Sequence, residues 1–171
     1  MAAVLPITPA AAAEAARGVY TVTRGFSRLL VDLAAFIEAE RDIEDVDIWD
    51  PAFMGWVRDA EHARQQVTGR LRALRGTVLH RREDGPLLRM ARVIEAMMAT
   101  EEPGEFLSRY RDLQHDRARF RCTGESAVAQ RVNQLLAAGL SRIDDLVTLG
   151  CFADEAAEPA PETDLPDLIA G

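Results

Sequence analysis

Apolar residues recur three and four positions apart along most of this chain, which is the spacing of one face of an α-helix. Thr8 followed by Pro9 has the pattern of an N-cap and a first helical residue, so we predict a helix from there to about Glu40. Its predicted core face consists of Val19, Val22, Phe26, Leu29, Leu33, Phe36 and Ile37. Gly25 lies within this face, where it either weakens the helix or lets a neighbouring helix approach closely.

Asp50 followed by Pro51 repeats the same start signal, and a second helix is predicted to run to about Arg82. Its apolar positions alternate in steps of four and three, as in a heptad seam. The seam consists of Phe53, Val57, Ala60, Arg64, Val67, Leu71, Leu74 and Val78. Residues 41–49 are predicted to form a loop whose apolar side chains cover the end of the bundle, with Trp49 and Trp56 packed there.

Three shorter helices are predicted in the second half of the chain, separated by turns at residues 83–86, 101–104 and 123–124. The first contributes the core residues Met90, Met97 and Met98, the next contributes Phe106, Tyr110, Leu113 and Phe120, and the last runs from about Glu125 to Leu149. The two helices that flank Pro103 are predicted to form one broken rod. The sequence therefore predicts an all-α fold, an antiparallel bundle of four to five long helices.

The domain organisation follows from a change in composition near residue 152. Residues 1–152 are predicted to form the bundle, whereas residues 153–171 are acidic, rich in Ala and Pro, and predicted to be a disordered tail. The tail ends with an apolar cluster, Leu165, Leu168 and Ile169, which has the layout of a tethered docking peptide for a protein partner. A hydrophobic groove with a basic rim is the expected target, and folding back onto the chain's own bundle is the alternative.

Charge is distributed unevenly along the chain, whose net charge is −8. All 20 basic residues are arginine; residues 58–92 carry nine of them against four acids, whereas residues 150–171 carry six acids and no base. Without a helix-turn-helix spacing or interleaved aromatic residues, the arginines predict ion pairs within the fold rather than a nucleic-acid surface. No signal peptide or membrane span is recognisable, and two cysteines without a CxxC pattern predict a cytoplasmic protein with free thiols.

Two Asp-x-x-His pairs are candidate metal ligands, namely Asp59 with His62 and Asp112 with His115. Glu38 or Asp32, together with Asp144, could supply further carboxylates. Residues three apart share a helix face, and di-iron bundles use comparable Glu-x-x-His pairs. However, the helical geometry turns both histidines away from the predicted core, where such a centre would lie. An exposed His62 could also serve a phosphotransfer module, although the residues that follow it match no such motif.

The functional prediction is a non-enzymatic interaction, regulatory or adaptor protein with a C-terminal docking peptide and no cofactor. A homodimer is predicted, because the seam of the second helix is longer than one chain needs to cover. Two alternatives remain: a metal-binding helical-bundle enzyme that uses the Asp-x-x-His pairs, and a small-ligand sensor with a cavity between helices.

Overall fold

The fold is all-α, as the sequence predicts. A computed structural model describes residues 9–44, 46–100 and 102–152, and within these ranges it contains five α-helices and no strand. The α-helices are α1 (Pro9–Glu44), α2 (Phe53–Arg75), α3 (Gly85–Met98), α4 (Pro103–His115) and α5 (Ala127–Leu146). Three short 3₁₀ helices are η1 (Arg82–Asp84), η2 (Arg117–Phe120) and η3 (Gly150–Phe152).

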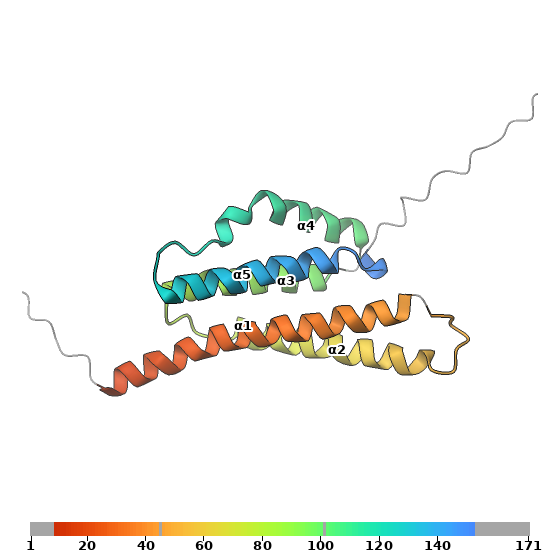
Figure 1. The fold of residues 1–171 in the computed structure, drawn as a ribbon, viewed down its shortest axis with the longest axis horizontal. Coiled ribbons are helices and arrows are strands. Elements are labelled where there is room, and N and C mark those ends of the chain that lie inside the picture. Colours follow the sequence, from red (N-terminus) through yellow and green to blue (C-terminus); the bar gives the residue numbers. More distant parts are fainter. Residues whose placement is uncertain (1–8, 45, 101, 153–171) are drawn as a thin grey trace, which may run out of the picture.

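Successive helices reverse direction, and they form three tiers (Figure 1). The long hairpin of α1 and α2 lies on one side, α3 and α5 pack against it, and α4 lies outermost, beyond α3 and α5. None of the described helices is both long enough and apolar enough to span a bilayer. The predicted tail, residues 153–171, lies outside the described residues.

The core face predicted for the first helix is confirmed from Val22 onward. Val22, Phe26, Leu29, Leu33, Phe36 and Ile37 are all buried. Gly25 allows the close approach of α2, because a Cβ atom at this position would lie 2.9 Å from Cδ2 of Leu74. Gly139 does the same for α5, where a Cβ would lie 3.3 Å from the Phe26 ring. Small residues therefore set how closely α1 meets its neighbours.

The second helix is shorter than predicted, since it ends at Arg75 rather than near Arg82. Gly76 and the β-branched pair Thr77 and Val78 favour helix weakly, and the chain must turn there to reach α3. Val78, predicted to lie on the seam, is 68% exposed. Ala60, Val67, Leu71 and Leu74 are buried within this one chain. The seam positions Phe53 and Val57 are only partly buried, and Arg64 is exposed. The homodimer therefore stays a prediction.

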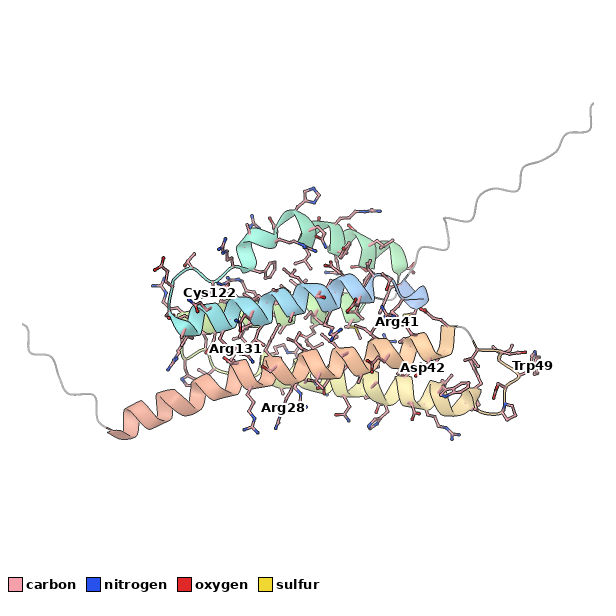
Figure 2. The ribbon with its side chains drawn as sticks, in the orientation of Figure 1. Arg28, Arg41, Asp42, Trp49, Cys122 and Arg131 are labelled. Atoms are coloured by element: carbon pink, nitrogen blue, oxygen red, sulfur yellow. The ribbon has the colours of Figure 1, made fainter. Side chains whose placement is uncertain are left out.

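The connector between α1 and α2 does not cover the bundle end. Ile48 is 65% and Trp49 83% exposed, and Figure 2 shows Trp49 at the tip of the loop. The loop is short and polar, and its side-chain oxygens stabilise local turns by accepting hydrogen bonds from the backbone. For example, Asp50 Oδ1 accepts from the Ala52 N–H at 2.7 Å. These turns delay the start of α2 to Phe53. Trp56, one turn into α2, is only partly exposed.

The broken-rod prediction is wrong. After the turn that precedes Pro103 the chain reverses, so that α4 runs back antiparallel to α3 instead of extending it (Figure 1). The following helix is also shorter than predicted: α5 begins after Ser126, whose Oγ accepts from the Ala129 N–H at 3.1 Å, and ends at Leu146. Gly150 begins η3. The methionine prediction is confirmed, because Met90, Met97 and Met98 are core residues.

Candidate functional site

Helix α4 is amphipathic but packs on the bundle over a small area. Its apolar positions, in steps of four and three, are Phe106, Tyr110 and Leu113, and only Phe106 and Leu113 are buried. Among its neighbours in the described chain, α4 makes its main contacts with α3 and with η3. The helix therefore covers the α3 and α5 tier incompletely.

A polar cluster on α5 holds one side of α4. Both oxygens of the Asp144 carboxylate accept from the Arg117 guanidinium, at 2.9 and 3.1 Å. Oδ1 of Asp144 also accepts from Tyr110 Oη and Gln114 Nε2, each at 3.0 Å. Burial, and then the hydrogen bond to Asp144, raises the pKa of the Tyr110 phenol. Tyr110 therefore keeps its proton and stays a donor at neutral pH.

An aromatic stack holds the N-terminal end of α4. The rings of Phe106 and Phe152 lie nearly parallel, with centroids 4.2 Å apart. Both side chains are buried, so the stack closes the bundle core at this end. It also places η3, and with it the last described residue of the chain, beside the start of α4 (Figure 1).

Opposite the polar cluster, α3 and α4 leave an open groove with a volume of about 660 Å³. Its apolar walls come from Val93, Ala96, Leu113 and Phe120. Its charged rim consists of Arg89, Arg92, Arg109, Arg119, Asp112 and Asp116. Four arginines against two aspartates leave an excess of two positive charges around an apolar floor. We call this feature the α3–α4 groove.

The rim arginines are only partly neutralised. Arg119 pairs with Asp116 at 2.7 Å, and Arg109 pairs with Glu105. Arg89 donates to the backbone oxygen of Arg119 at 3.2 Å and has no carboxylate partner among the residues described. Nε of Arg109 is buried, and within the described chain no acceptor meets it. The groove thus presents donors suited to an anionic ligand.

Basic character continues past the end of the groove. A second, more polar hollow of about 480 Å³ shares Arg89 with the groove and is also lined by Arg82, Glu83, Arg121 and Cys122. This hollow adds two arginines and one acid to the rim. The groove and its continuation therefore form one basic surface on the α4 side of the molecule.

The Asp-x-x-His pairs are not brought together. Asp59 and His62 are exposed on α2, and Asp112 and His115 are exposed on α4. The α3 and α5 tier separates these two helices in Figure 1. No cluster of three or more His, Cys, Asp or Glu side chains suited to a metal ion occurs among the described residues. Asp112 instead lines the α3–α4 groove.

The histidines find local partners on their own helices. His62 Nε2 lies 3.5 Å from Gln66 Nε2, and His115 Nδ1 lies 2.8 Å from the backbone oxygen of Arg111. The predicted docking residues Leu165, Leu168 and Ile169 lie outside the described residues. Nothing in the described structure therefore tests their role.

The two cysteines are not activated nucleophiles. Burial raises the pKa of the Cys122 thiol, with smaller contributions from nearby acids. Partial burial, and then the negative charges of Glu40 and Glu44, raises the pKa of Cys151 to about 11. Both thiols are free and protonated at neutral pH, so neither has the low pKa of a reactive cysteine.

Sequence reasoning missed the groove and a buried acid. Asp84 was assigned to a turn, but it is fully buried; its Oδ1 accepts from Thr23 Oγ1 at 3.4 Å, and its Oδ2 has no partner among the residues described. Burial raises its pKa, and the Thr23 hydroxyl opposes this shift. The available signal for the groove was the short apolar stripe of α4 flanked by arginines, which is too narrow to bury the whole helix.

Comparison with known proteins finds no counterpart: no family model matches the sequence, and neither a curated protein nor a solved structure is significantly similar to it. The fold and the groove therefore carry the functional argument alone. They define an all-α protein whose described part carries an apolar groove under a basic rim.

Proposed function

We propose that this chain is a non-enzymatic interaction protein that binds an acidic segment with apolar anchors in the α3–α4 groove. The observation that supports this proposal is the groove itself: an apolar floor of Val93, Ala96, Leu113 and Phe120 beneath four arginines. Laying an apolar helix face or an extended strip into such a groove is a common mode of peptide recognition. Arginine rims add geometric specificity, because guanidinium groups bind carboxylates in a bidentate manner.

The same features define the partner's chemistry. The floor is short, so it accommodates two or three apolar side chains rather than a long helix. Negative charge beside those anchors meets Arg89 and Arg92, which have no carboxylate partner among the described residues. A basic segment would meet like charges and be rejected. The expected partner is therefore an acidic, amphipathic protein segment that binds transiently.

A designed peptide provides the test. The probe has 14 residues, with Leu at three positions of one helix face and Asp or Glu elsewhere, and its counterpart replaces each acid with Lys. We expect the acidic probe to bind in fluorescence anisotropy, the basic counterpart not to bind, and Arg92→Glu to weaken binding at least about tenfold. Arg72→Glu on the exposed side of α2 is the matched control. Equal binding of both peptides, or no effect of Arg92→Glu, would reject the proposal.

A small-ligand sensor is the second candidate, and the volume of the groove favours it. About 660 Å³ lies within the range of small-molecule sites. The guanidinium groups on the rim would suit the carboxylate of a single-chain amphiphile. Dodecanoate distinguishes the two functions: binding of dodecanoate without binding of the acidic peptide would favour the sensor.

No described contact brings together the two Asp-x-x-His pairs that the metal-enzyme alternative requires. Self-association and a cytoplasmic location remain predictions. Light scattering that gives twice the 18.8 kDa chain mass would support a homodimer.

A further inference from the structure

We propose that, in the absence of a partner, the chain's own C-terminal segment occupies the α3–α4 groove. This inference rests on the proposed function, because the C-terminal segment would compete with an external partner for the same groove. The segment is residues 153–171, and its apolar anchors would lie on the floor of the groove. The anchor residues are Leu165, Leu168 and Ile169.

The described chain ends close to the α3–α4 groove. Phe152 stacks on Phe106 in the first turns of α4, so the described chain ends beside the helix that forms one wall of the groove. In Figure 1 η3 lies next to the start of α4. From there the groove extends along α4 from Arg109 to Asp116 and on to Phe120. A segment that leaves Phe152 enters the groove from its near end.

The segment between Phe152 and the apolar anchors is also long enough to reach the groove. Thirteen peptide units separate Phe152 from Leu165, which span at most about 45 Å when fully extended. As a flexible chain they have an end-to-end distance of roughly 20 Å. Along the axis of α4, Leu113 on the floor of the groove lies about 10 Å from Phe106 at 1.5 Å per residue, and Phe120 lies beyond the end of the helix in η2. The linker is therefore long enough for the anchors to reach the floor of the groove, as tethered binding requires.

The acidic charge of the C-terminal segment is complementary to the basic rim of the groove. Residues 150–171 contain six acids and no base, and Asp164 and Asp167 flank the first anchor. The groove and its polar continuation together present Arg82, Arg89, Arg92, Arg109, Arg119 and Arg121 against three acids. An acidic segment with apolar anchors is the chemistry that the proposed function assigns to a partner. The chain carries such a segment in its own sequence.

The other apolar hollow is a poorer target. It lies between α1 and α5, holds about 520 Å³, and is lined by Ser27, Val128 and Arg131 among others. Val128 and Arg131 belong to the first turns of α5, at the opposite end of that helix from η3, and Figure 2 shows Arg131 near that end. The linker would have to run the whole length of α5 first. The α3–α4 groove needs no such detour.

Tethering makes the tail an effective competitor. A short flexible linker gives an effective concentration of about 1 mM. If the tail binds with an intrinsic Kd of about 100 µM, it reduces the apparent affinity of an external peptide by about tenfold. An external partner must then bind tightly enough to displace the tethered tail from the groove. The tail would act as a built-in selectivity device.

The test compares full-length proteins with the acidic 14-residue probe. We expect the anchor variant, Leu165→Ser with Leu168→Ser and Ile169→Ser, to bind the probe about tenfold more tightly than the unmodified chain. The matched control, Ala156→Ser with Ala157→Ser and Ala160→Ser, changes the same number of tail residues and should leave affinity unchanged. Amide hydrogen exchange in α4 should also quicken in the anchor variant, because the groove loses its occupant.

The outcomes separate the two proposals. Equal affinity of the anchor variant and the unmodified chain overturns self-docking and leaves the proposed function standing. Absence of probe binding to either protein rejects the proposed function and this inference with it. A dimer that the anchor substitutions convert to a monomer places the tail in a neighbouring copy's groove, which overturns the intramolecular arrangement.

Discussion

The α1–α2 hairpin and helix α4 are stabilised in different ways. Along α1, Val22, Phe26, Leu29 and Leu33 are completely buried, and glycine lets α2 come close. Along α4, the side-chain hydrogen bonds to α5 that the structure shows run through the half-exposed carboxylate of Asp144. The hairpin gains its stability from apolar burial along its length, whereas α4 is held by two buried side chains, one aromatic stack and a few hydrogen bonds.

The difference indicates which region is available for binding. A helix with many buried apolar contacts opens only when the whole domain unfolds, whereas a helix held by few contacts opens locally at lower cost. Regions of low local stability are where ligand-binding surfaces commonly lie. The incomplete packing of α4 leaves the groove, so the same property explains both its weak attachment and its proposed role.

The largest expected effect comes from breaking the hairpin core. Leu71→Ala should lower the free energy of unfolding by about 2–5 kcal/mol, because the buried side chain leaves a cavity between α2 and its neighbours. Leu79→Ala, a half-exposed leucine in the following loop, is the matched control and should cost under about 0.5 kcal/mol. Urea denaturation measures both. Similar losses for the two variants would mean that Leu71 is not a core residue in solution.

A smaller and more local effect is expected at the polar cluster. Asp144→Ala removes the acceptor shared by Tyr110, Gln114 and Arg117, and should lower stability by about 1–2 kcal/mol. Hydrogen exchange should accelerate mainly at α4 amides and leave α1 and α2 protected. Uniform acceleration throughout the chain would show instead that α4 opens only with the whole domain.

The sequence predicted the hairpin well and α4 poorly, and the reason is the range of the interactions involved. Apolar periodicity identifies a face that must be buried, so the α1 core residues followed directly from their spacing. The end of α2 depends on a turn near Gly76, and the reversal of α4 depends on which surface the short helix meets after Pro103. Local propensity does not determine such long-range choices.

The groove could not be read from the sequence for the same reason. It forms between residues of α3 and α4 that become neighbours only because α4 folds back. Asp112 illustrates the limit. Its spacing to His115 suggested a metal ligand, but the fold places its side chain on the rim of the groove, away from the other pair on α2. Sequence spacing gave the shared face of a helix, but not what that face meets.

Asp84 provides a pH test of how the tiers pack. Its folded-state pKa is raised above the usual 3.8, chiefly by burial, so the charged form destabilises the fold above that pKa and the penalty fades as pH falls toward 3.8. Asp84→Asn should therefore raise the free energy of unfolding by about 1 kcal/mol at pH 7. The difference from the unmodified protein should shrink between pH 7 and pH 4. A difference that grows on acidification would contradict the burial of this carboxylate.

The smallest expected effect is a change in probe affinity that distinguishes the groove hypothesis from the metal-site alternative. Asp112 adds a negative charge to the rim, so Asp112→Asn should strengthen binding of the acidic probe by about two- to threefold, the effect of removing one half-solvated like charge. Asp59→Asn, the equivalent change on α2, should leave probe affinity unchanged. Both variants should keep their stability within about 0.5 kcal/mol.

A metal centre predicts a different pattern for the same two variants. Ligands of one ion act together, so Asp59→Asn and Asp112→Asn would each abolish stabilisation by added Zn²⁺ or Fe²⁺ in a thermal-shift assay. On the groove hypothesis neither substitution alters the response to metal, and only Asp112→Asn alters the response to the peptide. Parallel loss of a metal-induced shift in both variants would reassign Asp112 from the rim of a peptide groove to a metal site.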